Sequence, residues 1–136
     1  MRGKMAGLYA TDPTLLDSFG RLLVVIGFMA AAIRNVISRD QIEDHVARLA
    51  ATNAPMPRFA FWFGTAFEVI GCIMLAVDYH PATGALILLI FTVVATALLL
   101  RWWEAAEPKR SGMQNGFNAN IAVCGGLMLL MARLPW

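Results

Sequence analysis

Four long stretches of the chain consist almost entirely of apolar residues, and polar stretches separate them. A helix rises about 1.5 Å per residue, so about 20 apolar residues in a helix cross the hydrocarbon core of a bilayer. Each apolar stretch is close to that length or exceeds it. The pattern therefore predicts four membrane-spanning helices, at about residues 14–37, 58–77, 81–103 and 115–134.

The third stretch, "PATGALILLIFTVVATALLL", contains no charged residue. A four-helix bundle in water is the competing interpretation, but it needs a polar face on each of its helices. This stretch has no such face. The sequence therefore favours an all-α integral membrane four-helix bundle, formed by one domain that covers residues 1–136.

The segment "SRDQIEDHVARLAATNAPMP" between the first two spans is too polar to cross a membrane. Its apolar residues Ile42, Val46 and Leu49 recur at helical spacing, with charged residues between them. Ser38, followed by Gln41 three positions later, is typical of a helix start. The pattern predicts a short amphipathic helix at about residues 39–51 that lies in the membrane interface.

The start of the first span carries several charged residues. Asp12 is a suitable N-cap, and Pro13 suits the first helical position. Asp17 and Arg21 are four residues apart, a spacing at which opposite charges meet on the surface of a helix. We expect these two residues to form an exposed ion pair.

The composition agrees with a membrane protein and narrows its chemistry. Only 15% of the residues are charged, whereas soluble domains have about a quarter. The net charge is +2 and the basic residues are scattered, so we expect no nucleic-acid partner. The two cysteines and two histidines show no metal-ligand spacing, so no metal site is expected. His45 and His80 both lie outside the spans, which argues against a haem held by two histidines within the membrane.

Lysine and arginine residues are more frequent around the two longer loops than around the termini. The positive-inside rule places such loops in the cytoplasm. The sequence therefore predicts that the long loops lie on the cytoplasmic side, and we expect a multi-pass protein of the bacterial cytoplasmic (inner) membrane.

One acidic residue, Glu68, lies in the middle of the second span. A carboxylate at the bilayer centre costs about 3 kcal/mol on insertion scales, so it should face the interior of the bundle. The residues three and four positions away are small, and small residues let helices approach closely. They are Gly64, Thr65, Gly71 and Cys72.

The first and fourth spans carry similar rows of small residues, which include Gly20, Gly27, Gly125 and Gly126. Polar side chains lie in the half of the membrane nearer the long loops. We expect a polar cluster of Arg34, Glu68, Asn118 and Asn120, with Arg34 as a countercharge for the carboxylate. Two interpretations of Glu68 stay open, a proton relay and a carboxyl that joins helices structurally.

Several fragments, in order along the chain, match a known pattern. "GRLL" opens the first span, and "FEVIGC" places Glu68 three residues before a glycine. In "NIAVCGGLMLLM" an asparagine is followed by paired glycines. In these fragments the chain resembles the DoxX family of small four-span membrane proteins. Members of that family have been linked to quinone-coupled sulfur oxidation and to membrane-bound redox assemblies. The resemblance implies the four-span fold and a link to redox processes.

Two functions follow as expectations, and whether the protein is an enzyme stays open. The first is an accessory or structural subunit of a larger, redox-linked bacterial membrane complex. Its partners would be membrane lipid and other integral membrane subunits or a second copy, and it would bring no cofactor of its own. The second is an oxidoreductase module that binds quinone between its helices, with Glu68 as proton relay and Arg34 and Asn120 as polar contacts. The molecules bound would then be quinone or lipid. A transporter is a third, weaker candidate, because the sequence shows neither broken helices nor an internal repeat.

Overall fold

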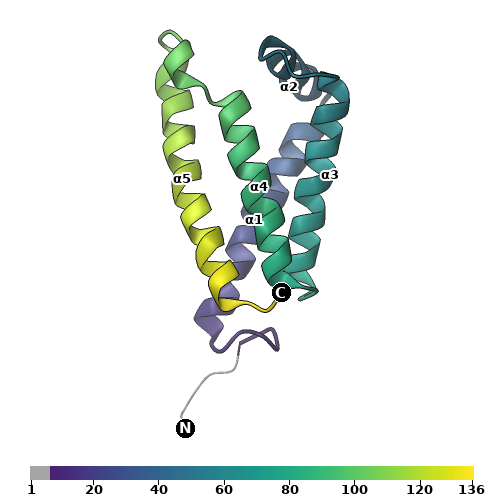
Figure 1. The fold of residues 1–136 in the computed structure, drawn as a ribbon, viewed down its shortest axis with the longest axis vertical. Coiled ribbons are helices and arrows are strands. Elements are labelled where there is room, and N and C mark those ends of the chain that lie inside the picture. Colours follow the sequence, from purple (N-terminus) through teal and green to yellow (C-terminus); the bar gives the residue numbers. More distant parts are fainter. Residues whose placement is uncertain (1–6) are drawn as a thin grey trace.

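The structure is a computed structural model that describes residues 7–136, and within that range all regular structure is helical (Figure 1). The all-α fold predicted from the sequence is therefore confirmed. The helices are α1 (Leu15–Val36), α2 (Arg39–Ala51), α3 (Pro57–Ala76), α4 (Pro81–Leu99), the short 3-10 helix η1 (Trp102–Glu104) and α5 (Lys109–Arg133).

Four of these helices, α1, α3, α4 and α5, are long and apolar enough to cross a membrane, and they run along the long axis of the molecule (Figure 1). Helix α2 lies at one end of this bundle, which we call the α2 end. The opposite end, the terminal end, holds the start of α1, the α3–α4 loop and the C-terminus. The amphipathic helix predicted at about residues 39–51 is present at those residues.

The helix starts follow local capping chemistry. Ser38 caps α2, because its side chain accepts a hydrogen bond from the backbone N–H of Gln41, as predicted. Helices α3 and α4 begin with proline at the first helical position, where no N–H is needed. The predicted Asp12 cap of α1 is wrong. Thr14 caps this helix, because its side chain accepts a hydrogen bond from the N–H of Asp17 at 3.2 Å. The Asp12 carboxylate accepts hydrogen bonds from other donors.

The last two spans differ in extent from the predicted ranges. Helix α4 ends at Leu99, and residues Trp102–Glu104 form η1 in place of a continued α-helix. Helix α5 begins at Lys109 rather than near residue 115, so the polar stretch "KRSGMQNG" is helical. Its 25 residues make α5 about 37 Å long, longer than a bilayer core requires.

Helices α3 and α4 pack backbone against backbone. A Cβ added to Gly71 would lie 3.0 Å from the carbonyl oxygen of Gly84, and a Cβ added to Gly84 would lie 3.0 Å from that of Gly71. The small residues of α3 therefore permit close packing, as expected. The buried apolar core continues from this contact and consists of Cys72, Leu75, Ala82, Ala85, Leu88, Leu127 and Leu134.

The glycines of α1 and α5 behave differently. A Cβ added to Gly20, Gly27, Gly125 or Gly126 would meet no atom within 4 Å apart from its own helix, within the described part of the chain. Large apolar side chains such as Leu16 and Leu129 on the same helices are strongly exposed. The outer faces of α1 and α5 are therefore apolar and lack a partner in residues 7–136.

Candidate functional site

Glu68 is buried in the interior of the bundle, with only 2% of its surface exposed. The hydroxyl of Thr65, on the same face of α3, donates to the carbonyl of Phe61 at 2.9 Å instead of to the carboxyl. Among residues 7–136, the acidic partners of ion pairs are Asp12, Asp17, Glu43, Asp44, Asp78 and Glu104, and Glu68 is not one of them. The interior position expected from the sequence is thus present, and the carboxyl has no countercharge there.

The other three residues of the expected polar cluster lie in separate environments. Arg34, in the last turn of α1, and Asn118, on α5, are both exposed. Asn120 is half-buried, and its Nδ2 donates to Oγ1 of Thr96 at 2.8 Å, which joins α5 to α4. In the described part of the chain no hydrogen bond joins two members of the expected cluster, and its binding of a ligand stays a prediction.

A buried charged cluster that the sequence analysis missed lies at the terminal end, around the fully buried side chain of Arg21. Its Nη2 lies 2.7 Å from Oδ1 of Asp78, and its Nη1 lies 3.3 Å from Oδ1 of Asp12. Its Nε donates to the carbonyl of Leu75 at 3.0 Å. The guanidinium therefore connects α1 to the last turn of α3, to the α3–α4 loop and to the segment before α1.

The segment before α1 completes this environment. The hydroxyl of Thr11 accepts from Nη1 of Arg21 at 3.0 Å and donates to Asp78 at 2.7 Å. The ring of Tyr9 covers the guanidinium, with its centroid 3.9 Å away, a cation–π contact. We call Tyr9, Thr11, Asp12, Arg21 and Asp78 the Arg21 cluster.

The expected exposed pair of Asp17 and Arg21 is wrong. Two other carboxylates and a backbone carbonyl satisfy Arg21 inside the protein, so its donors are used there. Asp17 instead lies 3.3 Å from Nη2 of Arg133, near the end of α5. At the terminal end, Arg21 and Asp17 on α1 therefore contact α3, the α3–α4 loop and α5 rather than each other.

Asp78 remains ionised at neutral pH. Burial opposes its ionisation, but hydrogen bonds from Arg21 and Thr11, together with the charge of Arg21, outweigh this and lower its pKa below the ordinary value. Asp78 has a positive φ of 62°, which directs the loop tightly from α3 into α4. Because the donors of Arg21 and the oxygen of Asp78 that faces them are already bonded, this cluster ties helices together and is poorly suited to proton transfer.

The structure offers few groups for a metal. Among residues 7–136 there is no group of three or more His, Cys, Asp or Glu side chains that could hold an ion. Cys72 and Cys124 are free cysteines, the first buried and the second half-buried. The notable polar features are therefore the unpaired Glu68 in the membrane interior and the Arg21 cluster at the terminal end.

The family model for DoxX matches residues 16–102, a range that contains Arg21, Arg34 and Glu68. The comparisons with curated proteins and with solved structures found no match. The match covers more than half of the chain and agrees with four helices able to cross a membrane. The chain is thus a multi-pass membrane protein and belongs to the DoxX family.

Proposed function

We propose that this protein is an accessory subunit of a larger, redox-linked bacterial membrane complex, and that it packs against a helix of another subunit through α1 and α5. The observation that carries the proposal is the row of open glycines on these two helices. Gly20 and Gly126 have free space where a side chain would be. Glycine at such positions in membrane helices is typical of close contact between helices. Membership in DoxX supports the redox link.

A groove of about 240 Å³ between α1 and α5 supports this proposed contact. Gly20 lines it from α1 and Gly126 from α5, and its other walls are mainly apolar. The ion pair between half-buried Asp17 and exposed Arg133 lies at its terminal end. In lipid, van der Waals packing against a neighbouring helix is a main source of association energy, and an apolar groove with glycine walls provides it.

Purification in a mild detergent, followed by identification of co-purified membrane proteins, tests this proposal. Gly126→Leu places a side chain into the groove and should remove the partner. Gly125→Leu is a matched control, because that glycine is equally open but does not line the groove. The control should keep the partner. Retention of the partner by the Gly126→Leu variant would exclude the groove as the contact, and a protein that purifies alone and binds a quinone analogue would exclude the accessory role.

A second function rests on a different observation, the buried Glu68 without a countercharge. A carboxyl held in a low-dielectric interior is suited to accept and release a proton when a ligand or charge arrives. In this hypothesis the protein is a quinone-interacting oxidoreductase module with Glu68 as proton relay. Glu68→Gln keeps the shape and removes the titrating group. Unchanged quinone-dependent electron transfer in membrane vesicles of that variant would eliminate the relay.

We also propose that the protein lies in the bacterial inner membrane with the α2 end in the cytoplasm. The reason is the concentration of basic residues at that end, which include Arg39, Arg48, Arg58, Arg101 and Lys109. A cysteine placed at the exposed position Gln41 should react with a membrane-impermeant maleimide in inverted vesicles and stay unreacted in intact spheroplasts. The opposite labelling pattern would reverse the orientation.

A further inference from the structure

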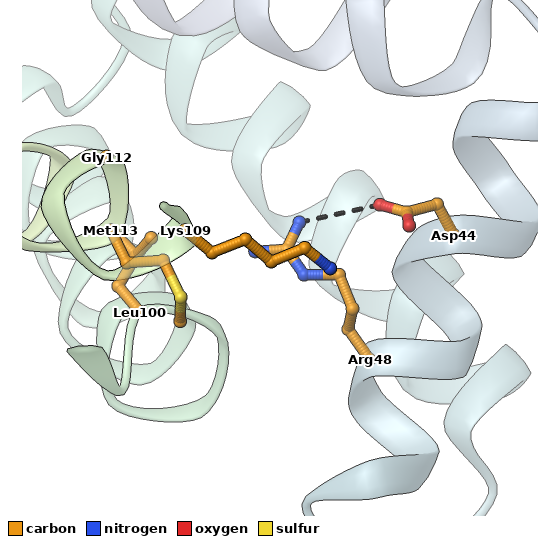
Figure 2. A pocket seen from close by; sticks show the side chains of 6 residues that line it. All are labelled: Asp44, Arg48, Leu100, Lys109, Gly112 and Met113. Atoms are coloured by element: carbon orange, nitrogen blue, oxygen red, sulfur yellow. Dashed lines mark ion pairs between the residues drawn. The ribbon is translucent and has the colours of Figure 1, made fainter. Parts of the chain in front are cut away.

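An open cleft of about 440 Å³ lies at the α2 end, between α2 and the start of α5 (Figure 2). Its volume falls within the range of about 300–1,000 Å³ that is typical of small-molecule sites. One wall comes from α2, the other from α5, and the residue after α4 closes one side. The lining residues are Asp44, Arg48, Leu100, Lys109, Gly112 and Met113.

Two basic side chains approach this cleft from opposite walls. Figure 2 shows Lys109 extending from the start of α5 toward Arg48 and Asp44 on α2. Arg48 is held across the gap, because its Nη2 donates to the carbonyl of Leu99 at 3.2 Å while its Nη1 lies 3.5 Å from Asp44. Of the two, only Arg48 has an acidic partner among residues 7–136. The lining therefore carries two cations and one anion, and one positive charge is uncompensated.

The cleft lies at the depth expected for lipid headgroups. Trp102 and Trp103 follow Leu100 after one intervening residue, Arg101, and tryptophan is enriched at that level of a membrane protein. The guanidinium of Arg110 lies over the ring of Trp102, 5.4 Å from its centroid, which adds another cation at the same level. Beside the charges, Leu100 and Met113 give the cleft apolar surface.

We propose that this cleft binds the headgroup of an anionic phospholipid, with its phosphate between Arg48 and Lys109 and its first acyl carbons over Leu100 and Met113. The uncompensated positive charge selects an anion, and the apolar surface at headgroup depth selects a lipid over a free anion. Basic pockets and basic clusters at the cytoplasmic surface are known to hold anionic lipid headgroups. The site is separate from the groove between α1 and α5.

Native mass spectrometry of the detergent-solubilised protein tests this inference with phosphatidylglycerol and phosphatidylcholine of the same acyl chains. Phosphatidylglycerol should bind several times more tightly. Lys109→Gln should weaken its binding about fivefold, the effect of one basic residue on an anionic lipid. Arg39→Gln removes a charge from the same end of the protein at an exposed position outside the cleft, and should change binding little.

A third variant tests the cleft by volume instead of charge. A Cβ at Gly112 meets no atom within 4 Å outside its own helix, so Gly112→Leu fills the cleft without disturbing the fold. It should abolish the preference for phosphatidylglycerol. Equal binding of the two lipids, equal losses in the Lys109 and Arg39 variants, or an unaffected Gly112→Leu variant would each overturn the proposal. Displacement of the lipid by an equal concentration of free glycerol phosphate would assign the site to a soluble anion and overturn it as well.

Discussion

The buried position of Arg21 makes its replacement the most informative test of the fold. Arg21→Met keeps a long helix-compatible side chain and removes the guanidinium. The Asp12 side chain, which is 2% exposed, would then lose its counterion, and Asp78 would lose its bond at 2.7 Å. Removing one partner of a buried pair costs about 3–5 kcal/mol, because the remaining charges stay desolvated. We expect the free energy of unfolding to fall by about that amount.

An exposed ion pair at the other end of the molecule provides the control. Arg58 and Glu43 lie 2.9 Å apart, close to the 2.7 Å of Arg21 and Asp78, but their side chains are 58% and 52% exposed. Exposed pairs contribute about 0–1 kcal/mol, because water screens both charges with or without the partner. Arg58→Met should therefore have little effect on stability. The two ion pairs therefore differ strongly in burial but hardly in the distance between their charges.

Unfolding by SDS titration in mixed micelles, followed by tryptophan fluorescence, measures both variants against the wild type. A cycle that combines Arg21→Met with Asp78→Asn isolates their pairwise energy, which should be about 0.5–3 kcal/mol for residues in direct contact. Equal destabilisation by Arg21→Met and Arg58→Met would refute the argument from burial. A coupling energy near zero would show that Asp78 does not stabilise the guanidinium.

Three further outcomes follow from other contacts. Because the Arg21 cluster lowers the pKa of Asp78, the stability due to its ionisation is complete above the ordinary value of 3.8 and is lost as the pH falls through the lower folded-state value. The difference in unfolding free energy between wild type and Asp78→Asn should thus be constant between about pH 5 and 8 and shrink below about pH 4. Gly71→Ala puts a methyl group 2.9 Å from Leu88 and should cost about 1–3 kcal/mol in SDS titration, whereas Gly125→Ala should be neutral. Asn120→Ala removes the hydrogen bond to α4 and should cost about 0.6 kcal/mol by the same measurement, and a neutral result would contradict that bond.

The spanning helices were predictable because the bilayer imposes one strong demand on sequence, a long apolar run. Hydropathy does not report where a helix ends outside the membrane. The polar stretch before residue 115 therefore looked like a loop, although α5 begins at Lys109. The amphipathic helix was predictable for another reason, since its cap at Ser38 and its spaced apolar residues are both local signals.

The candidate site was harder to predict, because depth in the membrane and direction around a helix are separate properties. The cost of a charge in lipid correctly indicated that Glu68 faces inward. It did not indicate the direction of Arg34, which lies in the last turn of α1 on an exposed side of that helix. Only the packing angles of the helices decide such directions, and the sequence does not state them.

Arg21 shows which signal could have located the missed cluster. The spacing to Asp17 supplied a local partner, and local spacing cannot detect a partner 57 positions away. The topology does contain that information. Two spans, α1 and α3, separate the start of α1 from the α3–α4 loop, so both segments lie at the same end of the bundle. Asp12 and Asp78 were therefore both available to a cation there. For an arginine at the edge of a span, the possible partners therefore include every acidic residue at the same end of the bundle.

The placement of this cluster also bears on the proposed subunit contact. The Arg21 cluster ties α1 to α3 at the terminal end through the fully buried guanidinium of Arg21. The link of α1 to α5 in that region is the ion pair of Asp17 with Arg133, whose side chains are 20% and 60% exposed. A buried tie on one side and a screened pair on the other make the α1–α5 side the weaker boundary of the bundle. A helix from another subunit can therefore enter the groove at little cost to the fold. If so, Arg133→Gln should leave stability within about 1 kcal/mol of the wild type and retain the co-purified partner, whereas Gly126→Leu should also preserve stability but release the partner.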